Sequence, residues 1–370
     1  MPIAPKTPGV YVKALSNSSQ PIAGVATAIT AFIGPARRGA LKTPTRVASF
    51  AEFEQNFGGL APDLETGYSV KQFFDNGGTA AWVVRVAKKA TKPQLVAGLK
   101  ALNALDLFNL LVLPGVSAAA VLTAAADYCR QRRAFLIVDA PAKAKTPAQM
   151  AQVVGDGVLP KTSFAAVYYP WLKIADPLNS GQTRIVAPSG TIAGLIAQSD
   201  AAQGVWKAPA NLSLSGVQGL EYAITETDSA LLSPLGVNCL RSFTGRGLRV
   251  WGARTLADDT EAEWKYIPVR RLALFVEESI DRGTKWAVFE PNAEPLWARL
   301  RDSVGSFLNS LWREGALLGA KPEAAFFVKC GLGTTMTQQD IDTGRVTIEL
   351  GIAPVRPAEF IILRIGQKAL

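Results

Sequence analysis

The side chains best suited to specific chemistry in this sequence are four arginines that fall between Cys239 and Ala257, with no acidic residue among them. They are Arg241, Arg246, Arg249 and Arg254, and Gly245, Gly247 and Gly252 divide the segment into short bends. The guanidinium group is a planar fork of donors that binds carboxylates and phosphates through paired hydrogen bonds. We therefore expect a basic loop that carries Trp251 and has arginine forks available for bidentate contacts.

Acidic residues follow this loop directly. They are Asp258, Asp259, Glu261 and Glu263. Opposite charges so close in sequence favour an internal network of ion pairs, in which the arginines neutralise these acids. Contact between the arginines and another subunit is the second interpretation, and the sequence leaves both open.

Catalysis has little support in the sequence. The chain contains no histidine, which excludes the Ser-His-Asp and Cys-His nucleophile systems and the usual histidine-containing zinc sites. The three cysteines, Cys129, Cys239 and Cys330, are far apart and lack CxxC spacing, so we interpret them as small buried hydrophobic residues. Neither a GxGxxG nor a GxxxxGK[ST] phosphate motif occurs. We expect no catalytic, cofactor-binding or metal site.

Two polar positions at the ends of predicted elements resemble places where α/β enzymes bind ligands. Asp139 ends an apolar strand, and we interpret it as a strand-end cap in preference to a catalytic acid. Ser189, followed by Gly190, starts a helix and is interpreted as its N-cap. An α/β enzyme of unknown reaction is kept as an alternative.

Length and charge bound the class of protein. A chain of 370 residues with 48% hydrophobic residues buries a sizeable core and should form two or three domains. Its net charge of +9 favours a partner with an acidic surface. The basic residues form no run interleaved with stacking aromatics, so a basic nucleic-acid-binding protein is the weaker alternative. No stretch has the apolar length of a signal peptide or membrane span, so we expect cytoplasmic synthesis and no stable membrane insertion.

The first 88 residues divide into an arm and a compact α/β unit. In residues 1–20 only Val10, Tyr11 and Val12 favour a strand, so we expect an extended arm that adds a strand to another sheet; a frayed terminus is the alternative. Residues 21–88 should form a unit that packs with the C-terminal part. Its predicted elements are a strand at 25–34, a helix at 49–57 capped by Ser49, a helix at 68–75 and a strand at 81–86.

Residues 89–210 alternate between apolar strands and helices, which predicts a central α/β domain with a parallel sheet. The predicted strands are 107–113, 134–139 and 164–169, and the predicted helices are 118–132, 147–154 and 189–200. The strands are nearly continuous apolar runs, as sheets buried on both faces require.

Residues 211–365 are predicted to form an α+β C-terminal domain, followed by a tail at 366–370. Its predicted elements are helices at 269–283 and 295–313 and strands at 286–289, 325–329, 346–352 and 360–365. The last strand is apolar on both faces and must be paired to stay soluble. On the helix at 295–313, short polar residues lie between Arg299 and Arg313; a close-packed partner and solvent explain this face equally well.

Ordered motifs at both ends of the chain resemble contractile tail sheath proteins, the family of myophage tails, tailocins and extracellular contractile injection systems. They are TPGVYVKAL, VATAITAFIGPARRGALKTPTRVASFAEFEQNFGG, YSVKQFFDNGGTAAWVVRV, GRGLRVWGARTLADD, EWKYIPVRRLALFVEESIDRGTKWAVFEPN and EPLWARLRDSVGSFLNSLWREGAL. The resemblance implies a structural protein, not an enzyme, that polymerises as stacked hexameric rings around an inner tube. It also implies contraction that drives the tube through a target envelope.

The same resemblance implies roles for particular segments. Both terminal segments would hook into neighbouring protomers, which makes Val10, Tyr11, Val12, Phe360, Ile361, Ile362, Leu363 and Ile365 candidates for an inter-subunit arm. A helix of the C-terminal domain would lie against the tube, which makes Arg299 and Arg313 candidates for tube contact. The implied partners are further copies of the chain, the inner tube protein, and baseplate and terminator or cap proteins, without cofactor or nucleic acid. The protein would form the outer layer of the particle.

Overall fold

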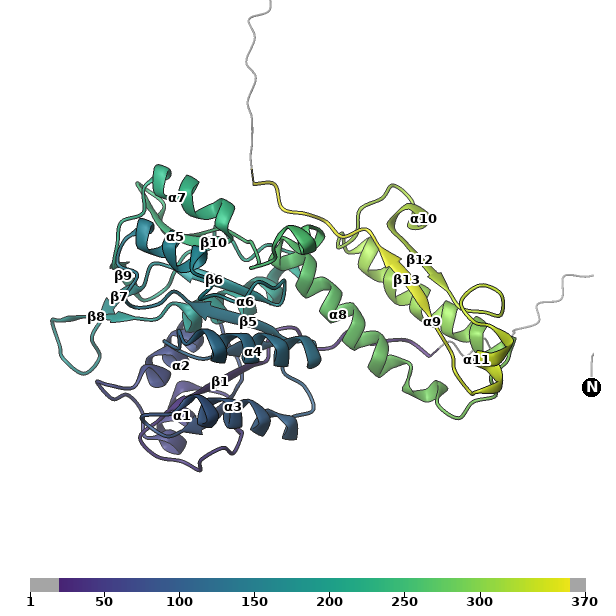
Figure 1. The fold of residues 1–370 in the computed structure, drawn as a ribbon, viewed down its shortest axis with the longest axis horizontal. Helices are drawn as coiled ribbons and strands as arrows, with labels where there is room; N and C mark the ends of the chain where they lie inside the picture. Colours follow the sequence, from purple (N-terminus) through teal and green to yellow (C-terminus); the bar gives the residue numbers. More distant parts are fainter. Residues whose placement is uncertain (1–19, 360–370) are drawn as a thin grey trace, which may run out of the picture. The chain divides into compact units, whose positions relative to one another are not determined.

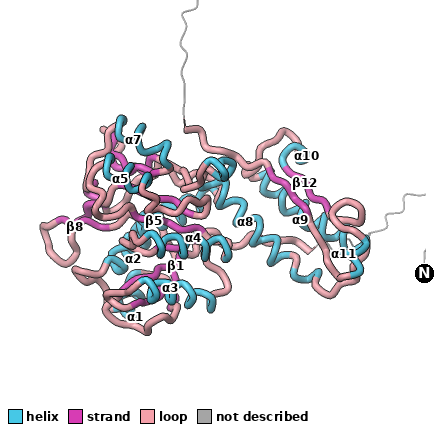
Figure 2. Tube along the Cα trace, viewed as in Figure 1, coloured by secondary structure: helices cyan, strands magenta, loops and turns pink. Residues whose placement is uncertain are grey.

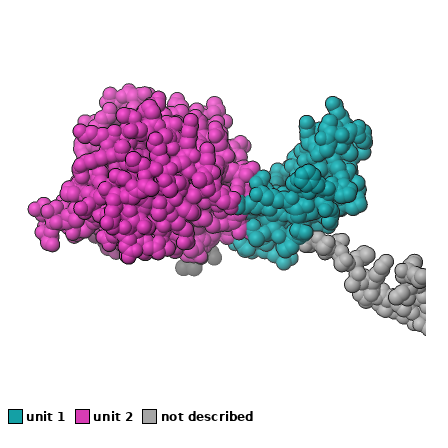
Figure 3. Space-filling view, turned by 90° about the horizontal axis from the view of Figure 1, so that it is seen from below, with its two compact units in different colours: residues 1–23, 279–353 teal, residues 24–278, 354–370 magenta. Residues whose placement is uncertain are grey.

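The computed structural model describes residues 20–359, and the chain divides into two compact units (Figure 3). Unit 1 comprises Met1–Ala23 and Ser279–Ala353, and unit 2 comprises Gly24–Glu278 and Pro354–Leu370. The predicted N-terminal arm up to residue 19 and the predicted strand at 360–365 lie outside the described residues. Between residues 20 and 359, no helix combines the length and apolar character needed to cross a bilayer.

An eight-stranded sheet forms the centre of unit 2 (Figure 1). Its strands are β1 (Thr30–Pro35), β2 (Thr45–Val47), β3 (Ala81–Val86), β4 (Leu110–Val112), β5 (Phe135–Asp139), β6 (Ala165–Tyr169), β10 (Val237–Phe243) and β11 (Gly247–Trp251). They lie in the order β11-β10-β6-β5-β4-β1-β3-β2. The inner strands run parallel to their neighbours, whereas the two edge strands, β2 and β11, are antiparallel. The predicted parallel sheet is confirmed.

Both faces of the sheet are buried, because alternate side chains enter two different cores. In β5, Leu136 and Val138 belong to one core, and Phe135 and Ile137 belong to the other. The first core is covered by α3 (Lys92–Ala101), α4 (Ala119–Gln131), α5 (Pro147–Gly155) and α7 (Glu226–Leu232). The second is covered by α1 (Phe50–Phe57), α2 (Glu65–Asp75), α6 (Ser189–Gln203) and a small sheet of β7 (Leu172–Ala175), β8 (Thr183–Val186) and β9 (Val217–Leu220). Helices on both faces make this a three-layer α/β architecture.

The sheet joins segments that were predicted to belong to three domains. β1 pairs with β4, so the strands of residues 21–88 lie in the central sheet. These residues also pack against the predicted C-terminal part, because Phe32 shares a core with Leu274 and the Thr27 carbonyl accepts a hydrogen bond from Arg271. β10 pairs with β6, so the central fold continues past the predicted boundary at residue 210. Both differences have one cause: strand pairing between distant segments depends on the tertiary fold, and one sequence does not show it.

Local sequence signals set the helix ends. The Ser49 Oγ accepts a hydrogen bond of 3.2 Å from the backbone N–H of Glu52, and Gly58, at φ 86°, ends α1. A left-handed residue at this position favours glycine. The predicted N-cap and the predicted glycine stop of this helix are therefore confirmed.

Unit 1 is built on the long helix α9 (Glu294–Arg313), shown in Figure 2. The apolar stripe of this helix is buried, as predicted. The stripe consists of Leu296, Leu300, Val304, Phe307, Leu308 and Leu311. The remaining elements are the short helices α10 (Pro322–Ala325) and α11 (Gln338–Asp342) and an antiparallel pair, β12 (Phe326–Lys329) and β13 (Glu349–Ile352). The predicted helix at 269–283 is present as α8 (Ile267–Gly283).

The predicted strand at 286–289 is wrong. Lys285–Ala287 forms a 3-10 turn, and Phe289 adopts φ 70°, in the left-handed region. A strand cannot continue through that conformation. The aromatic and β-branched residues that suggested a strand instead occupy a turn between α8 and α9.

Candidate functional site

The predicted basic loop is a β-hairpin, which corrects the loop assignment. Strands β10 and β11 pair antiparallel, and the turn between them contains Gly245 at φ 72° and leads into Gly247 at φ 70°. Positive φ at both positions explains why glycine occurs at each end of this short turn. Across the hairpin, Arg241 lies directly opposite Arg249.

Arg241 and Arg246 lie near the Phe243 ring on this hairpin, and Arg249 contacts Arg246. The Arg241 guanidinium lies 5.0 Å from the Phe243 ring centroid, and the Phe243 and Trp251 centroids are 4.6 Å apart. Arg246 donates to Asn211 Oδ1 at 2.9 Å, and the Arg249 Nε donates to the Arg246 carbonyl at 2.9 Å. We call this group the arginine hairpin: Arg241, Phe243, Arg246, Arg249 and Trp251.

Arg254 has a different role from the other three. It is 9% exposed and forms a two-pronged ion pair with Glu359, while its Nη1 donates to the Ser233 carbonyl at 2.7 Å. Tyr266 donates to the same carboxylate at 3.0 Å. Burial alone would raise the pKa of Glu359, but hydrogen bonds from Arg254 and Tyr266 outweigh it and leave that pKa below its ordinary value. The predicted pairing with the acids at 258–263 is therefore wrong for Arg254.

Those acids form a separate segment, which we call the acidic segment: Asp258, Asp259, Glu261 and Glu263. The Asp258 Oδ1 accepts from the Thr260 N–H at 3.0 Å and caps the 3-10 turn η3 (Asp259–Trp264). Hydrogen bonds from Thr260, assisted by the charge of Lys161, hold the pKa of Asp258 below its ordinary value. Asp259 and Glu263 are both exposed.

Asp139 is a structural group that joins two elements. Its Oδ2 accepts from the Gly115 N–H at 2.9 Å and from the Ser189 hydroxyl at 2.8 Å, and its Oδ1 accepts from the Ser189 N–H at 2.8 Å. The carboxylate therefore caps the start of α6 from the end of β5, which confirms the interpretation as a cap. Ser189 itself is not the N-cap, because Pro188 occupies that position. Burial raises the pKa of Asp139 to about 6.

The two arginines proposed to face the tube lie on α9 in different surroundings. The Arg299 Nη2 contacts Glu290 Oε2 at 2.6 Å, and its guanidinium lies 4.9 Å from the Trp286 ring centroid. Arg313 is exposed on the last turn of the helix. At 1.5 Å per residue, the two lie about 21 Å apart along the helix axis. Of these two arginines, Arg313 is exposed and Arg299 is half-buried.

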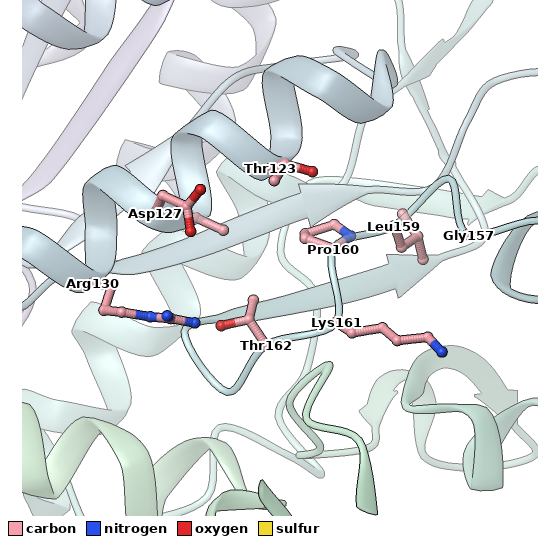
Figure 4. Close-up of a pocket in the computed structure, with 9 residues that line it drawn as sticks. Thr123, Asp127, Arg130, Gly157, Leu159, Pro160, Lys161 and Thr162 are labelled. Atoms are coloured by element: carbon pink, nitrogen blue, oxygen red, sulfur yellow. The ribbon is translucent and has the colours of Figure 1, made fainter. Parts of the chain in front are cut away.

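A pocket of about 280 Å³ lies between α4 and the loop at 157–162 (Figure 4). Its charged lining consists of Asp127 and Arg130 from the helix and Lys161 from the loop. Arg130 lies 5.4 Å from the Phe164 ring centroid, and the Lys161 side chain extends away from Arg130 in Figure 4. These charges do not converge on one ligand position.

The cysteines are buried, as predicted: Cys129 and Cys239 are 0% exposed and Cys330 is 2% exposed. Burial also raises the pKa of the Cys239 thiol to about 11, so the unreactive protonated form dominates. Across residues 20–359, no cluster of three or more Cys, Asp or Glu side chains is arranged to hold a metal ion.

Sequence reasoning missed two residues. Glu359 is a single acid just before a predicted strand, and nothing local identifies a partner 105 positions away. Phe289 is 102% exposed in a turn. Its neighbours Glu290, Pro291 and Asn292 favour a turn, and that signal could have shown that the ring is not part of a strand.

Two family models match consecutive parts of the chain. The model for the phage tail sheath protein central domain matches residues 88–256, and the model for the phage tail sheath C-terminal domain matches residues 259–368. The gap between the matches, residues 257–258, follows the arginine hairpin and includes Asp258, the first residue of the acidic segment.

Curated relatives carry the same description. The tail sheath protein of Burkholderia phage BcepMu is 32% identical over 160 residues, which cover 41% of this chain and 33% of that protein. The tail sheath protein of Escherichia phage P2 is 25% identical over 282 residues, which cover 72% of this chain and 66% of that protein. The chain thus matches about a third of the length of the first relative and about two thirds of the second.

Solved structures match along nearly the whole chain. The sheath complex of the extracellular contractile injection system PVC, in the contracted state, is 33% identical with a TM-score of 0.81, and the match covers 99% of each chain. The helical sheath of the anti-feeding prophage, in the contracted state, is 32% identical with a TM-score of 0.81 and covers 99% of this chain and 100% of that chain. A sheath tail protein from Desulfitobacterium hafniense, 10% identical with a TM-score of 0.64, shares the fold.

Proposed function

We propose that this chain, which belongs to the phage tail sheath protein family, is the structural protomer of a contractile sheath. Copies of it polymerise as stacked hexameric rings around an inner tube, and contraction of the polymer drives the tube through a target envelope. The observation that carries this proposal is the match, over almost the full length of both chains, to sheath proteins of two contractile injection systems. The role is structural, and the particle's outer layer is its place.

The β12–β13 pair supports a mode of assembly by strand addition. In the described part of the chain these two strands pair only with each other, so each presents an open backbone edge. A two-stranded sheet is marginally stable alone, and open edges accept further strands. We propose that arms from neighbouring copies, residues 1–20 and the predicted strand at 360–365, add to these edges. Each new backbone hydrogen bond would contribute about 0.5–1.5 kcal/mol.

The remaining partners are also part of the proposal. The exposed Arg313 makes α9 a candidate for contact with the inner tube, because a cation on a helix face attracts an acidic surface. A chain in the anti-feeding prophage baseplate structure is 32% identical with a TM-score of 0.79, which supports contact with a baseplate. A terminator or cap protein would close the other end of the polymer.

Electron microscopy of the purified full chain tests the proposal. We expect hollow helical polymers in negative stain and a rapidly sedimenting fraction that grows with protein concentration. A single monomeric species across the same concentrations, with a folded circular dichroism spectrum, would contradict it.

A further inference from the structure

The arginine hairpin extends beyond the carboxyl end of the parallel strand β6 in the central sheet. Strand β10 pairs with β6 only from Val237 to Cys239, which lie opposite Val167 to Tyr169 at the carboxyl end of β6. The rest of the hairpin, from residue 240 through the turn to β11, continues beyond that end. Arg246 lies in the turn and is exposed, and Trp251 is 38% exposed.

Positive charge is concentrated on this hairpin without an acid to balance it there. Arg241 and Arg249 are cross-strand partners, and like charges in that position repel. The polar groups that Arg246 and Arg249 contact are neutral oxygens, from Asn211 and from the Arg246 carbonyl. Within residues 20–359, the buried Nε of Arg241 has no hydrogen-bond partner. An anionic ligand would relieve the repulsion and fill the open guanidinium forks.

The acidic segment lies near the opposite end of the same strand, the amino end of β6. Leu256, just before it, bridges to Thr162, and the Glu261 Oε2 accepts from the Ser163 N–H at 2.7 Å. Thr162 and Ser163 are separated from β6 by one residue, so these acids lie near the amino end of that strand. At about 3.3 Å per residue, the amino and carboxyl ends of β6 are about 17 Å apart. The hairpin and the acidic segment of one chain therefore cannot meet.

Cations near the acidic segment do not remove its charge. Lys161 helps to lower the pKa of Asp258, and the charge of the buried Arg270 interacts with Glu277 as well as with Glu261 and Glu263. Arg270 is held between aromatic rings, 3.7 Å from the Trp264 centroid and 4.5 Å from the Phe164 centroid. Asp259 and Glu263 are exposed and remain accessible.

We propose that the arginine hairpin of one copy binds the acidic segment of the next copy. The inference rests on the proposed function, because it assigns residues to contacts within the polymer. The two patches have opposite charge and lie at opposite ends of β6, so contact between copies is head-to-tail. Such a contact extends into rings or helices and does not close a symmetric dimer. Guanidinium forks of Arg246 and Arg249 pair with carboxylates such as Asp259. Opposite charges also steer the incoming copy and fix its orientation.

A charge swap tests this pairing. The hairpin variant carries Arg246→Glu and Arg249→Glu in the arginine hairpin. The segment variant carries Asp259→Arg and Glu263→Arg in the acidic segment. A third chain, the quadruple variant, carries all four changes. Each single-sided variant should raise the critical concentration for polymerisation at least about tenfold, because like charges then face each other. The quadruple variant should restore the critical concentration to within about threefold of the value for the unchanged chain. Arg46→Glu, at an exposed position on β2, is the matched control and should assemble normally.

The outcomes separate the inference from the proposed function. Thermal melting first checks that every variant is folded. If the unchanged chain fails to polymerise, the proposed function fails. The pairing alone is overturned if the unchanged chain polymerises and both single-sided variants have the same critical concentration as it has. It is also overturned if the quadruple variant does not regain normal assembly. A third outcome is salt-sensitive DNA binding that is lost in the hairpin variant while polymerisation is unaffected. It would show that the hairpin binds nucleic acid and would also overturn the pairing.

Discussion

Arg254 and Glu359 face each other across 105 positions of sequence, with the Arg254 Nε 2.8 Å from one carboxylate oxygen and its Nη2 2.7 Å from the other. Both side chains belong to unit 2, and both are mostly buried. The pair fixes the last described residue of the chain beside the central sheet.

Removing the Glu359 carboxylate should destabilise unit 2. We expect Glu359→Gln to lower the free energy of unfolding by about 1–3 kcal/mol, because Arg254 is then left buried without its charge partner. Urea denaturation followed by circular dichroism measures the change. Glu349→Gln is the matched control: its carboxylate is 53% exposed, 3.7 Å from Lys329, and should contribute less than about 1 kcal/mol. Equal effects of the two changes would show that the buried pair contributes no more than a surface pair.

Asp139 should make stability fall as pH rises from about 4 to 6. Its folded-state pKa, raised by burial to about 6, lies above the ordinary value of 3.8, so between those values the folded state binds the proton more tightly. Each pKa unit corresponds to about 1.4 kcal/mol. Asp139→Asn should remove this dependence, whereas Asp156→Asn, at an exposed position, should keep it. Unfolding curves from pH 4 to 7 that are parallel for the unchanged chain and Asp139→Asn would refute the assignment.

Phe289→Gly should stabilise unit 1. The residue adopts φ 70° and its side chain is 102% exposed, so glycine relieves backbone strain without losing buried area. We expect the free energy of unfolding to rise by about 0.5–1 kcal/mol. Val288→Ala, at a neighbouring residue that is 62% exposed, should change it by less than about 0.5 kcal/mol. A destabilised Phe289→Gly variant would mean that the ring makes a stabilising contact.

Deleting residues 1–20 should abolish polymerisation and leave the cores folded. Under the strand-addition proposal, the arm contributes backbone hydrogen bonds to a neighbour's sheet, and the buried cores of unit 2 begin only after it. Circular dichroism and sedimentation together decide the outcome. A truncated chain that unfolds, or one that assembles at the normal concentration, would rule out an inter-subunit arm.

Arg313→Glu should weaken attachment to the inner tube more cleanly than Arg299→Glu. Arg313 is exposed, whereas Arg299 contacts Glu290 at 2.6 Å, so glutamate at 299 would place two carboxylates together and also disturb the turn before α9. We expect Arg313→Glu to leave the melting temperature unchanged and to reduce co-sedimentation with tube protein at low salt. Undiminished co-sedimentation across a salt series would show that this end of α9 faces another surface.

Most elements were predictable because their signals are local. Ser49 and Gly58 bracket α1, and the apolar stripe from Leu296 to Leu311 defines α9. The missed helix α3 also had a readable signal, since Thr91 and Gln94 form a capping box at its start. The strands β7, β8 and β9 have only four residues each, too few to establish an alternating pattern.

The relationships between distant segments were not predictable. The insertion of β1 between β3 and β4 and the pairing of Arg254 with Glu359 join residues that share no local pattern. The arginine hairpin lies between these cases. The Gly-Arg-Gly turn and the alternation of Leu248, Arg249, Val250 and Trp251 are hairpin signals, but the edge of the sheet to which they belong emerges only from the assembled fold.

The central position of β1 has a mechanical consequence. Six of its residues are in register with β3 and three with β4, both parallel to it, so tension along its axis shears two hydrogen-bonded ladders at once instead of unzipping bonds one at a time. The chain leading into unit 2 from the N-terminal side can therefore carry load. At the other end, Glu359 is held by Arg254 and Tyr266, a contact that a small displacement would break. Pulled from both ends, the molecule should yield first at its C-terminal side.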